Sequence, residues 1–103
     1  MYKLEFLPIA KKDIENIIYY ISNNLKNKTA AINLSNNFIK AVNNIVEFPY
    51  GSPEYKIFTK LKYVYRKIKI KNFLMFYTIN EENKTIIVVR ILYSKMNINN
   101  ILE

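Results

Sequence analysis

Cysteine, histidine and tryptophan are absent from this sequence, and glycine occurs only once, at Gly51. Without cysteine there is no disulfide framework, no thiolate metal ligand and no thiol nucleophile. Without histidine the chain lacks the most common general base and the most common metal ligand. The acidic residues are scattered along the sequence, so we expect no metal ion and no cofactor.

Long apolar runs are also missing. The longest, around Phe73–Phe76 and Ile86–Val89, fall far short of the ~18 residues that span a membrane. The N-terminus has no cationic leader followed by an apolar stretch, so a signal peptide is not predicted and we expect a cytoplasmic protein. With 103 residues, half of them hydrophobic, residues 1–103 are predicted to form a single domain with one core.

Positive charge is abundant and unevenly placed. The net charge is +8, yet residues 1–53 carry six lysines against four acids, whereas residues 54–103 carry ten lysines or arginines against four acids. This asymmetry suggests a polyanionic partner, either nucleic acid or an acidic protein segment. The alternative is solubility combined with a lysine-rich codon bias, although such a bias would raise lysine equally in both halves.

Hydrophobic periodicity predicts an α+β fold. A short alternating strand is followed by two amphipathic helices, with Thr29 or Asn27 as the N-cap of the second, and then by a meander of three strands with a turn at Asn80–Asn83. The expected arrangement is a helical hairpin on one face of an antiparallel sheet. The predicted elements are a strand at Tyr2–Leu7, helices at Ile9–Leu25 and Thr29–Phe48, and strands at Tyr63–Lys71, Phe73–Asn80 and Lys84–Tyr93.

The first strand of the meander alternates strictly between apolar and basic residues. Tyr65, Lys67, Lys69 and Lys71 share one parity of the pattern. Alternating lysines on an antiparallel strand are typical of its solvent face, and they also discourage pairing between sheet edges. The other interpretation is a working surface that contacts a partner.

The only two arginines, Arg66 and Arg90, lie in otherwise apolar rows of the predicted strands. A charge among core residues requires a partner, so we expect ion pairs between sheet and helix, with Glu5, Asp13 or Glu15. Arginine is also suited to multi-donor recognition. We therefore nominate a partner-binding set. It comprises Arg66, Lys71, Arg90, Tyr65 and Tyr63.

Several short motifs, in this order and spacing, resemble the RelE/ParE superfamily of bacterial type II toxins. They are Phe48-Pro49, Tyr65-Arg66, Asn72–Tyr77 and Arg90–Tyr93, together with the pattern of the first helix, and they cover nearly the whole chain. The resemblance implies a small toxin neutralised by a cognate antitoxin. It also implies a target: ParE-like members inhibit DNA gyrase without nuclease activity, and RelE-like members cleave mRNA on the ribosome.

The RelE-like pattern is only partly present. It implies catalytic roles for Lys67 and Lys69, and the places of its C-terminal arginine and tyrosine correspond here to Tyr93 and Lys95. A lysine flanked by cations can act as a base without histidine. However, the arginine expected on the next strand corresponds to Leu74. We therefore expect a gyrase inhibitor of the ParE-like type, with a ribosome-dependent mRNA endoribonuclease as the alternative and a non-toxic nucleic-acid-binding module as the second alternative.

Overall fold

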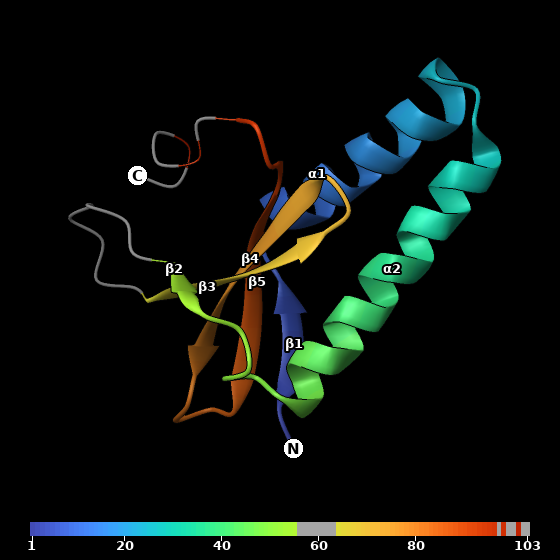
Figure 1. Cartoon of the computed structure of the whole chain (residues 1–103). Coiled ribbons are helices and arrows are strands. Elements are labelled where there is room, and N and C mark those ends of the chain that lie inside the picture. The colour runs from blue at the N-terminus through green and yellow to red at the C-terminus, as the bar shows by residue number, and fades with distance from the viewer. Residues whose placement is uncertain (56–63, 97, 99–100, 102–103) are drawn as a thin grey trace.

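The computed structural model describes residues 1–55, 64–96, 98 and 101. Two helices lie on one face of a five-stranded sheet (Figure 1), which confirms the predicted α+β fold. In chain order the elements are β1 (Lys3–Phe6), α1 (Pro8–Tyr19), the π-helical turn η1 (Tyr20–Asn24), α2 (Lys28–Glu47), β2 (Glu54–Tyr55), β3 (Tyr65–Ile70), β4 (Phe73–Asn80) and β5 (Thr85–Tyr93).

The helices begin where local chemistry favours a helix start. Pro8 occupies the first turn of α1, where its missing N–H is not needed. Asn27 caps α2 by accepting a hydrogen bond from the N–H of Ala30 at 3.0 Å, which confirms Asn27 rather than Thr29 as the N-cap. The first helix was expected to continue to Leu25, and its last turn is in fact π-helical.

The sheet has the order β1-β5-β4-β3-β2 and is mixed, not wholly antiparallel as expected. The pairs β2–β3, β3–β4 and β4–β5 are antiparallel, but β1 runs parallel to β5. A parallel pair requires a long connection, and the helical hairpin with the meander supplies it. Alternation in a short strand predicts that the strand exists but does not predict its direction.

The core lies between the helices and the sheet. Its fully buried members include Ile45 from α2, Met75 and Tyr77 from β4, and Ile86 and Val88 from β5. The hydroxyl of Tyr77 donates a hydrogen bond of 2.9 Å to the carbonyl of Pro49, in the turn after α2. This bond satisfies a polar group that would otherwise be buried without a partner.

A second, smaller cluster covers part of the opposite, helix-free face of the sheet. Phe76 and Leu92 pack there with Ile98, and Leu74 and Ile101 border them. β4 is therefore buried on both faces, as its unbroken apolar sequence predicted. Ile98 and Ile101 are helical, whereas residues 97, 99–100 and 102–103 lie outside the described residues.

Neither helix of the described chain has the length and apolar character needed to cross a bilayer. Among the same residues, no group of three or more potential metal ligands comes together.

Candidate functional site

Two of the predicted lysines lie side by side on the helix-free face. Lys67 and Lys69 pair across β3–β4 with Phe76 and Leu74, so the neighbouring strand presents apolar side chains to them. The ammonium of Lys67 lies 4.8 Å from the centroid of the Tyr55 ring, within cation–π range. Lys69 is exposed.

Lys71 does not continue this row. It is the first residue of the turn between β3 and β4 and has a φ of 54°. Its side chain is exposed at the end of the sheet.

The structure does not bring the four candidate catalytic residues together. Tyr93 pairs with Phe73, and the two rings lie 6.0 Å apart. Phe73 packs against Phe38 of α2, so Tyr93 lies on the helix side of the sheet, opposite Lys67 and Lys69. Lys95 is exposed in the turn that follows Tyr93.

The chemistry available beside Lys67 and Lys69 is therefore limited. The row of β4 that faces them contributes Leu74 and Phe76, so no guanidinium is supplied at Leu74 to clamp a phosphate. Two lysines on one strand face can bind a polyanion or an acidic segment. General acid–base cleavage needs a second proton-transfer group, and Tyr93 lies on the other face.

Arg66 joins the sheet to the turn that follows α2. Its guanidinium donates a hydrogen bond of 2.5 Å to the carbonyl of Ser52, pairs with Glu54 at 3.5 Å and lies 5.0 Å from the centroid of the Tyr50 ring. An ion pair was expected, but with Glu5, Asp13 or Glu15. That expectation is wrong for Arg66, because β2 pairs with β3 and places Glu54 opposite Arg66.

Arg90 forms the expected ion pair with α1. Its Nε and Nη2 donate to the two carboxylate oxygens of Asp13 at 2.8 and 3.0 Å. The same carboxylate accepts the N–H of Ile91 at 3.0 Å. The parallel pairing of β1 with β5 extends only to Phe6 and Val88, so Asp13 provides an acceptor for β5 beyond the end of β1.

The sequence places Arg90 in an apolar row with Ile86, Val88 and Leu92; the structure keeps it on one face with Leu92 but not with Ile86 and Val88. The register of β4 and β5 shifts between Phe76 and Tyr77, so Val88 pairs with Tyr77 whereas Arg90 pairs with Phe76. A bulge of this kind inserts one residue and reverses the alternation beyond it.

Two residues of the partner-binding set meet in one groove on the helix-free face. Arg90 and Tyr65 line a groove of about 430 Å³. The other lining residues are Leu7, Ile9, Thr78, Ile87, Val89 and Ile101. Arg66 and Lys71 lie elsewhere, and Tyr63 lies outside the described residues.

Leu7 and Ile9 were not predicted as site residues. They are 40% and 47% exposed, which is high for aliphatic side chains, and both line the groove. The signal was present in the sequence: both lie outside the apolar stripe of the first helix, which begins at Ile14. An apolar residue outside the core stripe is a candidate contact residue.

A polar cluster around Glu81 was also missed. Its carboxylate accepts hydrogen bonds from Tyr2 at 2.7 Å and Tyr50 at 2.5 Å, and it pairs with Lys84. The hydrogen bonds from Lys84, Tyr2 and Tyr50 lower the pKa of Glu81 to about 2, and the bond to Glu81 raises the pKa of Tyr50 to about 12. The cluster joins the start of β1, the turn after α2 and the β4–β5 turn, which is a structural role.

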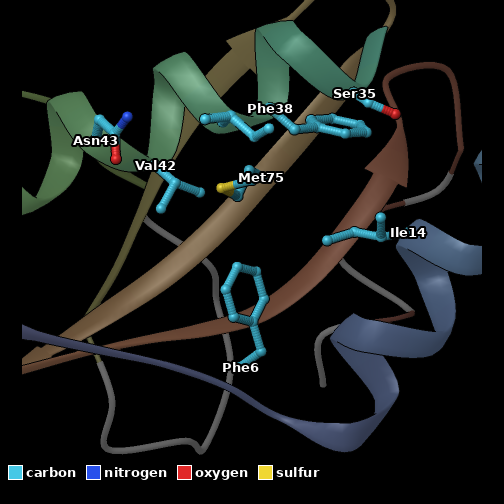
Figure 2. A pocket seen from close by; sticks show the side chains of 8 residues that line it. Phe6, Ile14, Ser35, Phe38, Val42, Asn43 and Met75 are labelled. Carbon is cyan, nitrogen blue, oxygen red and sulfur yellow. The ribbon is translucent and has the colours of Figure 1, made fainter. Parts of the chain in front are cut away.

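A further groove of about 320 Å³ lies between the two helices, above the sheet (Figure 2). Met75 lies at its base, and Phe6 and Ile14 line it from β1 and α1. α2 contributes Ser35, Phe38, Ile39, Val42 and Asn43. The hydroxyl of Ser35 donates to the carbonyl of Ala31, and the lining residues carry no charge, so this groove offers no group for acid–base chemistry.

Comparison with known proteins relates this architecture to toxins. The family model described as the ParE toxin of the type II toxin-antitoxin system parDE matches residues 4–98. The chain is similar to a structure of the chromosomal ParDE system of P. aeruginosa, with a TM-score of 0.70, 14% identity and coverage of 92% of this chain and 98% of that one. Among curated protein sequences, none matches.

RelE-type structures share the fold as well. The archaeal RelE–RelB complex of Pyrococcus horikoshii OT3 has a TM-score of 0.58 and 10% identity, covering 91% of this chain and 96% of that one. The intact E. coli RelBE complex has a TM-score of 0.56 and 17% identity, covering 93% and 100%. At these identities the likeness shows the fold alone. The family model spans nearly the whole chain, and the protein therefore belongs to the ParE toxin family of type II toxin–antitoxin systems.

Proposed function

We propose that the protein is a growth-inhibiting toxin that acts on DNA gyrase without cleaving RNA, and that a cognate antitoxin neutralises it in the cytoplasm. One observation carries the choice of target. Tyr93 lies on the face of the sheet opposite to Lys67 and Lys69, and Leu74 stands beside Lys69 where the nuclease pattern has an arginine. Arg90 is on the same face as the lysines, but its guanidinium is bound to Asp13.

The family and a groove on the surface both support an antitoxin as the binding partner. The groove lined by Leu7, Ile9 and Val89 is apolar, with Arg90 and Tyr65 supplying polar atoms. An extended segment or an amphipathic helix with aliphatic anchors fits such a surface. The similar ParDE and RelBE structures are of toxin–antitoxin systems, which is the basis for transferring this kind of partner to this chain.

Inducible expression in a bacterium tests the proposal. Induction of soluble protein is expected to stop growth, and co-expression of a small neighbouring open reading frame with a DNA-binding N-terminus and an acidic tail is expected to restore it. Primer extension on transcripts from the arrested cells is expected to show no new cleavage sites. Normal growth with confirmed soluble protein would refute the toxin assignment.

A ribosome-dependent mRNA endoribonuclease is the second candidate, because Lys67 and Lys69 do share one face of a strand. Two lysines with this spacing can flank one phosphate. Codon-dependent cleavage in a translation extract, lost in Lys67→Ala/Lys69→Ala, would favour this candidate. A basic module without toxicity would instead bind nucleic acid with an affinity that falls steeply as salt rises.

A further inference from the structure

The end of the sheet next to α1 carries a groove that the proposed function does not use. It has a volume of about 410 Å³ and lies on the helix side. One wall comes from α1, η1 and the residue that follows. It carries Ile17, Ile21 and Leu25 at helical spacing, with Asn16 and Tyr20 beside them. The other wall is aromatic, with Phe73 and Tyr93 from the ends of β4 and β5. We call it the end groove.

Hydrogen bonds and ring contacts hold the aromatic wall in place. The N–H of Ser94 donates to the carbonyl of Asn72 at 2.9 Å and so ties the end of β5 to the β3–β4 turn. The Phe73 ring packs edge-to-face between Phe38 and Tyr93, at centroid distances of 6.3 and 6.0 Å. A preformed wall reduces the entropy lost on binding.

Three exposed lysines are close in sequence to residues that line the end groove. Lys26 directly follows Leu25, Lys71 directly precedes Asn72, and Lys95 follows Tyr93 by two residues; all three side chains are exposed. Within the described part of the chain, none of the three forms an ion pair. Glu15, next to the lining residue Asn16, is the one acid adjacent in sequence to a lining residue.

Acidic residues gather at the other end of the sheet instead. Glu81 and Glu82 lie in the β4–β5 turn, at the opposite end of β4 from Lys71. Lys84 and Lys3 offset these acids, so the end of the strands next to the end groove is the more positive one. Charge complementarity directs an acidic ligand to this end.

The backbone close to the end groove is irregular. Lys26 and Lys71, with φ of 50° and 54°, are two of the three non-glycine residues with positive φ among those described, and the groove wall includes the π-helical turn η1. Positive φ is disfavoured for a side chain with a Cβ, and glycine is the usual residue there. Irregular backbone of both kinds is enriched at functional sites.

We propose that the end groove binds an acidic amphipathic segment of a protein partner, which inserts an aliphatic side chain between the two walls while its carboxylates meet Lys26, Lys71 and Lys95. Tyr20, Phe73 and Tyr93 are aromatic, but the aliphatic row of Ile17, Ile21 and Leu25 favours a peptide over nucleic acid, because single-stranded nucleic acid binds through stacking platforms along a continuous basic track. This proposal rests on the proposed function, in which the partner is an antitoxin with an acidic segment.

Selection from a phage library of random peptides of about twelve residues, on the full-length protein, tests the proposal. The enriched peptides are expected to combine several Asp or Glu residues with a Leu, Ile, Met or Phe. Lys26→Gly/Lys71→Gly is expected to weaken their binding about fivefold, since each exposed charge pair contributes modestly. Leu25→Ser, at a residue that is 56% exposed, is expected to weaken it about tenfold.

Lys84→Gly is the matched control for Lys71→Gly. Lys84 also has a positive φ, of 51°, and its replacement removes the same charge, but it lies in the β4–β5 turn at the far end of β4, where it pairs with Glu81. It is expected to change peptide binding less than about twofold. Because glycine relieves positive φ, Lys26→Gly and Lys71→Gly are expected to fold at least as well as the parent, as thermal unfolding will show.

Enrichment of non-acidic peptides, an equal effect of Lys84→Gly and Lys71→Gly, or displacement of the peptides by a single-stranded RNA of similar length would overturn the proposal. Because the assay does not read out growth, the two proposals fail separately. A protein that selects acidic peptides without arresting growth contradicts only the toxin function, and one that arrests growth without selecting them contradicts only the end groove.

Discussion

Removal of the Asp13 carboxylate is expected to be the most destabilising single change among the polar contacts. Asp13 and Arg90 are 13% and 24% exposed, and the carboxylate accepts three hydrogen bonds, two from Arg90 and one from Ile91. Breaking a fully buried pair costs about 3–5 kcal/mol, and the partial exposure of Arg90 reduces this. We expect Asp13→Ala to lower the free energy of unfolding by about 2–4 kcal/mol.

Urea denaturation followed by circular dichroism measures this loss. Asp13→Asn retains one acceptor and is expected to lose about half as much. Glu15→Ala is the control on the same helix, because Glu15 is exposed and its removal should stay within about 0.5 kcal/mol. A loss of less than about 1 kcal/mol in Asp13→Ala would refute the argument that Asp13 both neutralises Arg90 and completes the edge of β5.

Three further outcomes are expected. Lys67→Ala/Lys69→Ala should change the free energy of unfolding by less than about 1 kcal/mol and should still arrest growth on induction. If the double variant instead loses both growth arrest and transcript cleavage, the protein is a nuclease. Tyr77→Phe removes the 2.9 Å bond to the buried carbonyl of Pro49 and should cost about 1–3 kcal/mol in urea denaturation; no loss would show that the bond is not needed. The pKa of Glu81 is lowered from 4.5 to about 2, so its contribution to folding stability is present above pH 4.5 and is lost as the pH falls towards 2. In acid unfolding, Glu81→Gln should lack this loss of stability between pH 4.5 and 2, and the same acid unfolding curve as the parent would contradict the assigned pKa.

Local patterns in the sequence predicted the elements well. The expected strand Phe73–Asn80 coincides with β4, and the apolar stripe of the second helix predicted α2 to within one residue at each end. Both elements are long, and their hydrophobic pattern repeats several times, which is where periodicity is most informative.

The candidate site was less predictable, because it depends on register and on pairing between distant strands. The bulge in β5 places Arg90 opposite Phe76, and no feature of the single strand marks it. Tyr93 pairs with Phe73 on the neighbouring strand, and the two rings lie on the same face of the sheet. Lys67 and Lys69 lie on the other face. Glu54 reaches Arg66 through a strand of only two residues, too short for a periodic signal.

Supercoiling of relaxed plasmid by purified DNA gyrase, with and without the purified protein, tests the central claim most directly. The proposed function predicts that the protein blocks supercoiling and that the same preparation leaves mRNA intact in a translation extract. Undiminished supercoiling together with mRNA cleavage that depends on Lys67 and Lys69 would contradict the account.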